Sequence, residues 1–174
     1  MSVTSTVRDH FTPLAEYPHV REDVTLHDVF AELKAKYDSA DNFRSVLVLD
    51  ADNRLLGTLG VHDLLHALLP DYLKQTPARY EGGAGDISYL ATLWQDDCRE
   101  NCRQAAAAPI AAHVRPVRAV LAPDDPLAKA FYLFATQPVK VLAVIEGNRV
   151  VGVLRRYDVV NEVLKAILGE GDGA

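Results

Sequence analysis

Two aspartates occupy equivalent places in two similar stretches of the chain. Asp63 comes six residues after Gly57, and Asp158 comes six residues after Gly152. An ionised carboxylate can accept hydrogen bonds from two donors at once, which suits it to hold a polar ligand. The alternative is that each aspartate caps the predicted helix in whose first turn it lies. The residue types leave the binding role and the capping role equally open.

Basic side chains lie close to these aspartates in the sequence. His62, Arg155 and Arg156 are at or next to the predicted helix starts, where free backbone N–H groups favour anions. A cation there opposes the helix dipole, which indicates that an anion is expected. Together these groups could hold a phosphate, with the planar guanidinium of Arg155 as a clamp. The alternative is that they are ordinary solvent-exposed side chains.

Other chemistries find little support in the sequence. His62 and His66 are one helical turn apart, and so are Cys98 and Cys102. Neither pair has further ligands at a fixed spacing, so we expect no metal. The chain has no Gly-x-Ser-x-Gly elbow, no phosphate loop and no His-Glu-x-x-His pair, which are the signatures of several enzyme classes. We therefore predict that the protein is not an enzyme.

An internal repeat positions the candidate residues. Gly57 and Gly152 are 95 positions apart, and so are Asp63 and Asp158. Each glycine lies in the second strand of a predicted hairpin, whose strands are short apolar runs rich in β-branched residues. The Asp-Asn and Gly-Asn pairs at the two turns tolerate positive φ. Amphipathic helices are predicted before and after both hairpins.

The first copy of the repeat is longer than the second. The helices that precede the hairpins start near Leu26 and Leu127, which are 101 positions apart. This offset exceeds that of the glycines by six. We predict that the first copy has about six extra residues between helix and hairpin, around residues 39–42.

Each copy has the order strand, helix, strand, strand, helix (βαββα). We predict an α+β fold in which two such units pack as a pseudo-two-fold pair with an inserted helix between them, because a unit of ~50 residues is marginal alone. The predicted division is an N-terminal segment 1–16, repeat 17–70, a loop plus helical insert 71–113, repeat 114–168 and a C-terminal tail 169–174.

The composition narrows the choice of partner and compartment. The 174 residues are 49% hydrophobic and carry a net charge of −6, so neither nucleic acid nor an anionic membrane is expected as a partner. No apolar run approaches the ~20 residues of a membrane span. Residues 1–10 lack the apolar core of a secretory signal. We predict a cytoplasmic protein with reduced cysteines.

Two segments resemble the cystathionine-β-synthase-type (CBS) domain: Gly57-Thr58-Leu59-Gly60-Val61-His62-Asp63 and Gly152-Val153-Leu154-Arg155-Arg156-Tyr157-Asp158, with their flanking strands and helices. The resemblance covers about 17–70 and 114–168. A pair of such domains resembles the Bateman module. This implies a homodimer, a regulatory role toward an unknown partner protein, and AMP, ADP, ATP or S-adenosylmethionine as ligand in the clefts between the domains.

The resemblance also implies roles for single residues. Asp63 and Asp158 would accept hydrogen bonds from the ribose hydroxyls of the ligand. The backbone at Val20 and Val120 would face the adenine ring, although apolar strand residues belong to the core by default. These roles complement the phosphate-binding role considered above for the basic residues.

One departure from the family pattern favours a second hypothesis. The family usually has Ser or Thr three residues after the motif glycine, whereas this chain has Gly60 and Arg155 there. Neither copy keeps the hydroxyl. The alternative function is therefore a ligand-free dimerisation or scaffold module whose clefts have degenerated.

The insert is the most individual part of the sequence. We predict a loop followed by a helix over residues 86–105, because apolar residues recur there at helical spacing. The predicted stripe consists of Ile87, Leu90, Leu93, Trp94 and Cys98. A tryptophan on such a stripe favours burial, and we expect the stripe to be buried within a homodimer.

Overall fold

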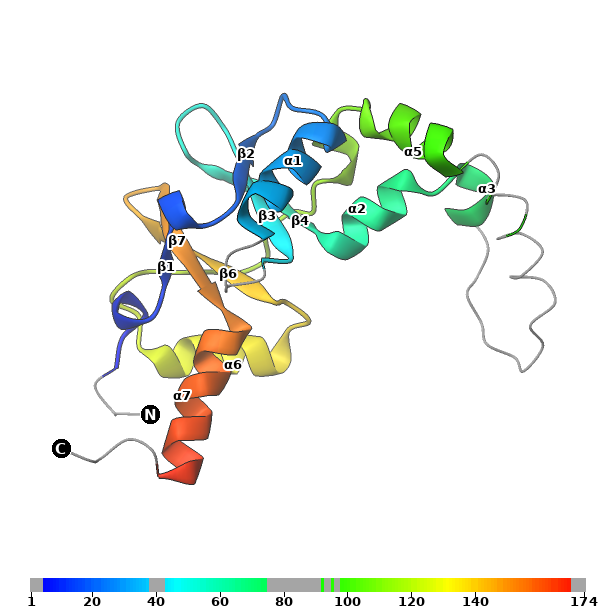
Figure 1. Cartoon of the computed structure of the whole chain (residues 1–174). Helices are drawn as coiled ribbons and strands as arrows, with labels where there is room; N and C mark the ends of the chain where they lie inside the picture. Colours follow the sequence, from blue (N-terminus) through cyan, green and yellow to red (C-terminus); the bar gives the residue numbers. More distant parts are fainter. Residues whose placement is uncertain (1–4, 38–42, 75–91, 93–94, 96–97, 170–174) are drawn as a thin grey trace.

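The computed structural model describes residues 5–37, 43–74, 92, 95 and 98–169. These residues form two small β-sheets with helices packed on them (Figure 1). The strand order is β2-β3-β4 in one sheet and β1-β7-β6-β5 in the other. Each sheet contains the strands of one predicted repeat.

The first repeat has the predicted order of elements. Strand β2 (His19–Arg21) pairs in parallel with β3 (Ser45–Leu49), which pairs antiparallel with β4 (Leu55–Gly60). Helix α1 (Leu26–Tyr37) connects β2 to β3, and α2 (Val61–Leu68) follows β4 directly. This is the βαββα unit expected from the sequence.

The second repeat has the same topology. Its elements in order are β5 (Val120–Leu121), α6 (Leu127–Thr136), β6 (Val141–Glu146), β7 (Arg149–Arg155) and α7 (Arg156–Leu168). Strand β5 is parallel to β6, and β6 is antiparallel to β7. The predicted α+β fold of two βαββα repeats is confirmed.

The hairpin turns behave as their residues predict. Asn53 has φ 63° in the first turn, and Gly147 and Asn148 have φ 55° and 69° in the second. Asparagine and glycine tolerate this left-handed region better than other residues do. The tight turns place the two strands of each hairpin side by side.

The extra residues of the first copy lie in two places. The strand pairing shifts after Val48 in β3 and after Val144 in β6, and these equivalent residues are 96 positions apart. Helices α1 and α6 start 101 positions apart. Five extra residues therefore lie between the start of α1 and β3, and the sixth lies in the hairpin turn. The predicted place, 39–42, is outside the described residues.

Strand β3 is buried on both faces. Because successive side chains of a strand point to opposite faces, Val46 and Val48 pack with the helices of the first repeat, whereas Leu47 and Leu49 pack toward the second sheet. The interior has one cluster under the helices of each repeat and a third cluster between the sheets. This third cluster consists of Tyr17, Phe43, Leu47, Leu49, Val150 and Val153.

Two short segments cross from one repeat to the other. The first crossing segment, residues 5–13, leads into the first repeat, but its strand β1 (Thr12–Pro13) pairs with β7. The second crossing segment, residues 108–116, leads into the second repeat, but Arg115 pairs with Thr58 of β4 through backbone hydrogen bonds of 2.9 and 3.0 Å. Each sheet is thus completed by the chain that enters the other repeat.

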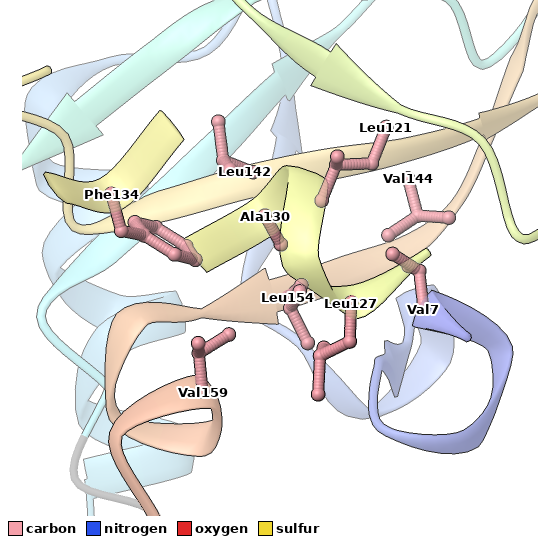
Figure 2. Packing of buried hydrophobic residues seen from close by; sticks show 9 residues of the cluster. All are labelled: Val7, Leu121, Leu127, Ala130, Phe134, Leu142, Val144, Leu154 and Val159. Carbon is pink, nitrogen blue, oxygen red and sulfur yellow. The ribbon is translucent and has the colours of Figure 1, made fainter. Parts of the chain in front are cut away.

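Each crossing segment also brings one apolar side chain into a core. Val7 lies on the one-turn helix η1 (Val7–Asp9) and joins the core of the second repeat beside Leu127 and Val144, as Figure 2 shows. Ile110 lies on η3 (Ile110–His113) and is part of the core of the first repeat. Both side chains are fully buried. A further turn, η2 (Leu14–Glu16), joins β1 to β2.

The crossings explain the two motif glycines. A Cβ atom at Gly57 would lie 2.3 Å from Cγ1 of Val114, and one at Gly152 would lie 2.2 Å from Cδ2 of Phe11. Both separations are well below a van der Waals contact between carbon atoms, so a side chain would push the crossing segment away. The glycines that reveal the repeat in the sequence are therefore places of close backbone approach.

The structure describes only part of the segment between the repeats. A short helix, α3 (Asp71–Lys74), follows α2, and α5 (Cys98–Ala106) packs against α2 and α1 (Figure 1). Helix α5 overlaps the second half of the predicted helix 86–105 and ends one residue beyond it. Four stripe residues are outside the described residues: Ile87, Leu90, Leu93 and Trp94. In the part of the chain that the structure describes, no helix has both the length and the apolar character needed to cross a bilayer.

Candidate ligand-binding site

Both predicted aspartates lie in the first turn of the helix that follows a hairpin. The Oδ2 atom of Asp63 accepts the backbone N–H of Gly60 at 3.0 Å, and Oδ2 of Asp158 accepts that of Arg155 at 3.1 Å. Each carboxylate thus caps its helix by a bond back to the N-cap residue. Both side chains are largely buried, with 12% and 14% of their surface exposed. The two positions differ in the arginine that pairs with each carboxylate.

The guanidinium of Arg155 binds the Asp158 carboxylate. Its Nε atom lies 2.9 Å from Oδ2, and its Nη2 atom lies 2.8 Å from Oδ1. Arg155 is 21% exposed and stacks over the Phe43 ring, 5.7 Å from its centroid, where the π face attracts a cation. Arg155 is therefore an ordered ion-pair partner and not the solvent-exposed arginine of the alternative hypothesis.

The Phe43 ring under this arginine is part of an aromatic pair. Phe43 packs edge-on against Tyr17, with 5.0 Å between the ring centroids. The Tyr17 hydroxyl lies 2.7 Å from the Ser45 hydroxyl. Burial raises the pKa of Tyr17 to about 12, so its hydroxyl stays protonated at neutral pH. The Arg155–Asp158 pair thus packs on buried aromatic side chains of the cluster between the sheets.

Asp63 has a different partner. Its Oδ1 atom is paired with Nε of Arg115 in the second crossing segment. The Arg115 side chain is 64% exposed. His62 Nδ1 lies 3.8 Å from the same oxygen, but the His62 side chain is 80% exposed. The His62 ring stacks on His66, with 6.4 Å between the centroids. The groups around Asp63 therefore come from two segments and face water.

A cavity of about 330 Å³ opens beside Asp63. Its wall combines α2, α3, η3 and the second crossing segment. The lining residues are Asp63, His66, Lys74, Ala112, His113, Val114, Arg115 and Pro116. A second cavity of about 320 Å³ lies between α2 and α5 and shares Lys74 and His113 with the first.

His113 connects the two cavities. The pKa of its imidazole is lowered, first because the ring is partly buried, and further because Lys74 and His66 repel an added positive charge. These surroundings favour the neutral imidazole over the charged one. Lys74 has an ion-pair partner in Asp71, at 3.0 Å, but this aspartate is almost fully exposed.

The other predicted site residues lie apart from the cavity lining. Arg156 is exposed at the start of α7, and its backbone N–H donates to Lys140 O at 2.9 Å. Val20 packs against the core of the first repeat and pairs with Val48. Val120 is exposed and pairs with Ala143. The ligand roles of these three residues stay predictions.

Metal and thiol chemistry gain no support from the described residues. Among them, no group of three or more His, Cys, Asp or Glu side chains is arranged to hold a metal ion. The Sγ atoms of Cys98 and Cys102 lie 3.8 Å apart, within hydrogen-bonding distance, and form no disulfide. Burial raises the pKa of the Cys102 thiol, which keeps it less reactive than a free thiolate.

Sequence reasoning missed Lys74, His113 and Arg115. A signal for Arg115 was present, because Pro13 and Pro116 are 103 positions apart and each follows the residue that pairs with a motif strand. No comparable signal marks Lys74 or His113. They line the cavity only because α3 and η3 lie next to α2 in the folded chain.

Comparison with known proteins agrees with this architecture. The family model described as CBS domain matches residues 7–70 and 112–165, which is more than half of the chain. The chain belongs to the CBS domain family. No curated protein matches it.

Solved structures of CBS-pair proteins have the same fold. The CBS-pair protein CBSX2 from Arabidopsis thaliana is 18% identical, with a TM-score of 0.66 over 94% of this chain and 96% of that chain. CBSX2 in complex with AMP is 19% identical, with a TM-score of 0.63 over 93% and 98%. The cytosolic domain of the Mg²⁺ channel MgtE in complex with ATP is 21% identical, with a TM-score of 0.60 over 88% and 46%.

Proposed function

We propose that the chain is a regulatory module that binds an adenine nucleotide or another adenosyl ligand at Asp63 and signals to a partner protein. The proposal rests on one observation: the Asp63 carboxylate borders a cavity and is held by an exposed arginine. A ligand that satisfies the carboxylate can displace that arginine, because the Arg115 side chain is already 64% exposed and its guanidinium can be solvated by water. The AMP of CBSX2 and the ATP of the MgtE domain support this ligand class.

Displacement of Arg115 would affect both repeats. Its backbone completes the first sheet, and the chain then leads directly into β5 of the second. A ligand that moves this side chain biases the packing between the repeats by no more than its differential affinity for the two arrangements. We propose a binding output toward a partner protein and no catalytic step. The two thiols form no disulfide, which fits a reducing compartment, and we propose a cytoplasmic location.

Titration calorimetry of the full chain with AMP, ADP, ATP and S-adenosylmethionine tests the proposal. We expect at least one ligand to bind with one site per chain. Asp63→Asn should weaken that binding at least tenfold, about 1.4 kcal/mol, because the ribose hydroxyls lose an ionised acceptor. Asp158→Asn is the matched control and should change the affinity less than twofold. Absence of heat with every ligand, beside a cooperative thermal transition, would contradict the proposal.

The alternative function, a ligand-free scaffold module, has one specific observation in its favour. The Asp158 carboxylate is occupied by Arg155 from its own helix start. Gly60 and Arg155 also replace the hydroxyl expected there. If the same closure applied at Asp63, calorimetry would detect no ligand and Asp63→Asn would alter only the stability of α2.

We also propose a homodimer, with a second copy on the outer face of the second repeat. Helices α6 and α7 expose large apolar side chains, whereas α5 packs against the corresponding side of the first repeat. The exposed side chains are Phe131, Tyr132, Tyr157, Val160, Leu164, Ile167 and Leu168. Such an apolar surface is typical of an interface. Light scattering should give twice the chain mass, and Ile167→Glu should halve it, while Leu65→Glu on α2 leaves it unchanged.

A further inference from the structure

Basic side chains gather around one cavity of an acidic protein. The net charge of the chain is −6, yet His66, Lys74, His113 and Arg115 line the cavity beside Asp63. They come from α2, α3, η3 and the second crossing segment. Among the described lining residues, Asp63 is the acidic one. Segments far apart in the sequence thus place their basic groups against the same space.

The partners of these groups do not neutralise the cavity. Arg115 is paired with Asp63, and Lys74 pairs with Asp71 at the exposed end of α3. An ion pair with so exposed a carboxylate is weak and screened by salt. His113 then has no acidic lining residue against it, and Lys74 and His66 repel its proton. A bound anion would relieve this repulsion.

Every element packed around His113 adds to the same pattern. Helix α2 contributes His66 and the Arg115-paired Asp63, and α3 contributes Lys74. Helix α5 contributes the uncharged Asn101 and Gln104 on the side of the second cavity. An anion that enters between Lys74 and His113 therefore meets cationic or neutral donors and one carboxylate that is already paired.

We propose that this basic cavity receives the polyphosphate of the nucleotide bound at Asp63, and that His113 takes up a proton when it does. The inference rests on the proposed function and names the ligand class. Asp63 holds the sugar, and His66, Lys74 and His113 line the same cavity, where a chain of several phosphates would meet them. A nucleoside triphosphate is selected over a monophosphate, and the cationic S-adenosylmethionine is disfavoured. Binding strengthens as the pH falls, because the bound anion favours the charged imidazole.

Titration calorimetry with ATP, AMP, adenosine and inorganic tripolyphosphate at pH 7.5 and 6.0 tests this inference. We expect ATP to bind at least tenfold more tightly than AMP at pH 7.5, and a further threefold or more at pH 6.0. Buffers of different ionisation enthalpy should report net proton uptake with ATP. Adenosine should show neither the pH dependence nor the uptake.

Variants separate the basic cavity from the rest of the site. Lys74→Gln should weaken ATP at least fivefold and leave adenosine within twofold. His113→Gln should remove the pH dependence and the proton uptake. Lys165→Gln on α7 and His27→Gln on α1 make the same chemical changes on exposed surface away from the cavity and should have no effect.

The outcomes distinguish the two proposals. ATP and AMP of equal, pH-independent affinity that still depends on Asp63 would overturn the polyphosphate inference and leave the proposed function intact. If no adenosyl ligand binds, the proposed function fails. Tripolyphosphate then decides the inference alone: binding that Lys74→Gln weakens supports a basic anion site, and no binding overturns it.

Discussion

Asp63 and Asp158 occupy the same place in two copies of one fold, and they differ in what holds them. Arg155 binds Asp158 from within the same helix start, with two nitrogens at 2.8 and 2.9 Å. The residue equivalent to Arg155 in the first repeat is Gly60, which has no side chain. Asp63 is instead paired with Arg115, from a different segment.

This difference shows how one residue can give two repeats different roles. An arginine three residues before the aspartate satisfies the carboxylate locally, as oppositely charged residues at this helical spacing do. A glycine has no side chain to pair with the carboxylate, so an arginine from another segment pairs with it and can be displaced by a ligand. The first position then suits exchange of partners, while the second contributes to the packing between the sheets through Phe43.

The largest expected effect on both repeats comes from displacement of the crossing segments. Gly152→Val and Gly57→Val should each lower the free energy of unfolding by about 3 kcal/mol, because an added side chain clashes with Phe11 or Val114. Urea unfolding measures the loss. Gly60→Ala is the control, since its Cβ would meet Asp63 Oδ2 at 3.4 Å, and its cost should stay below about 1 kcal/mol. Equal costs for all three variants would contradict this account of the motif glycines.

Exchanging the two residues before the aspartates should exchange the properties of the positions. Gly60→Arg should let an arginine close Asp63 and weaken ligand binding at least tenfold, about 1.4 kcal/mol. Arg155→Gly should free Asp158 and raise the calorimetric stoichiometry from one site per chain toward two. An unchanged stoichiometry would show that the Asp158 position lacks other parts of a site.

The two ion pairs should differ in strength. In a double-mutant cycle, Arg155→Ala with Asp158→Ala should give a coupling energy of about 1–2 kcal/mol, because the pair is mostly buried and bidentate. Arg115→Ala with Asp63→Ala should give about 0.5 kcal/mol or less, because Arg115 is mostly exposed. Urea unfolding of the wild type, the four single variants and the two double variants gives both values. Equal coupling energies would remove the proposed distinction.

The smallest expected effect is the dependence of stability on pH. The pKa of His113 is lowered in the folded protein, so the unfolded chain takes up the proton first. The contribution of His113 to stability is fully present above the unfolded pKa of about 6.5 and is lost as the pH falls below it. His113→Gln should therefore lose less stability than the wild type between pH 7.5 and 5.5, whereas His27→Gln should match the wild type.

The repeated hairpins and helices could be predicted from the sequence because their signals are local. Gly57 and Gly152 mark the second strand of each hairpin, and apolar residues at helical spacing mark the helices. The crossing segments carry no such signal. Strand β1 has two residues, too few for a periodicity, and its partner β7 is about 140 positions away. Val7 and Ile110 are single apolar residues whose burial depends on the whole fold.

The candidate site could be predicted only where a motif ran through it. Asp63 and His62 were found because they end the first motif. The pairing of Arg155 with Asp158 follows from their spacing on a helix start, and it could have been inferred. Lys74 and His113 reach the cavity through tertiary packing of short helical turns, which residue spacing does not encode.

The exchanged crossing segments bear on how such a chain can arise. Consider a half that contained residues 108–168 alone. Its crossing segment would lack the strand β4 with which it pairs, and its sheet would lack the strand β1 that pairs with β7. Two identical halves related by a two-fold axis could supply each other with the missing backbone pairing, each through its crossing segment. Duplication and fusion of such a gene would keep this exchanged pairing within one polypeptide. The present chain has the arrangement that a domain-swapped dimer would have if its two copies were joined end to end.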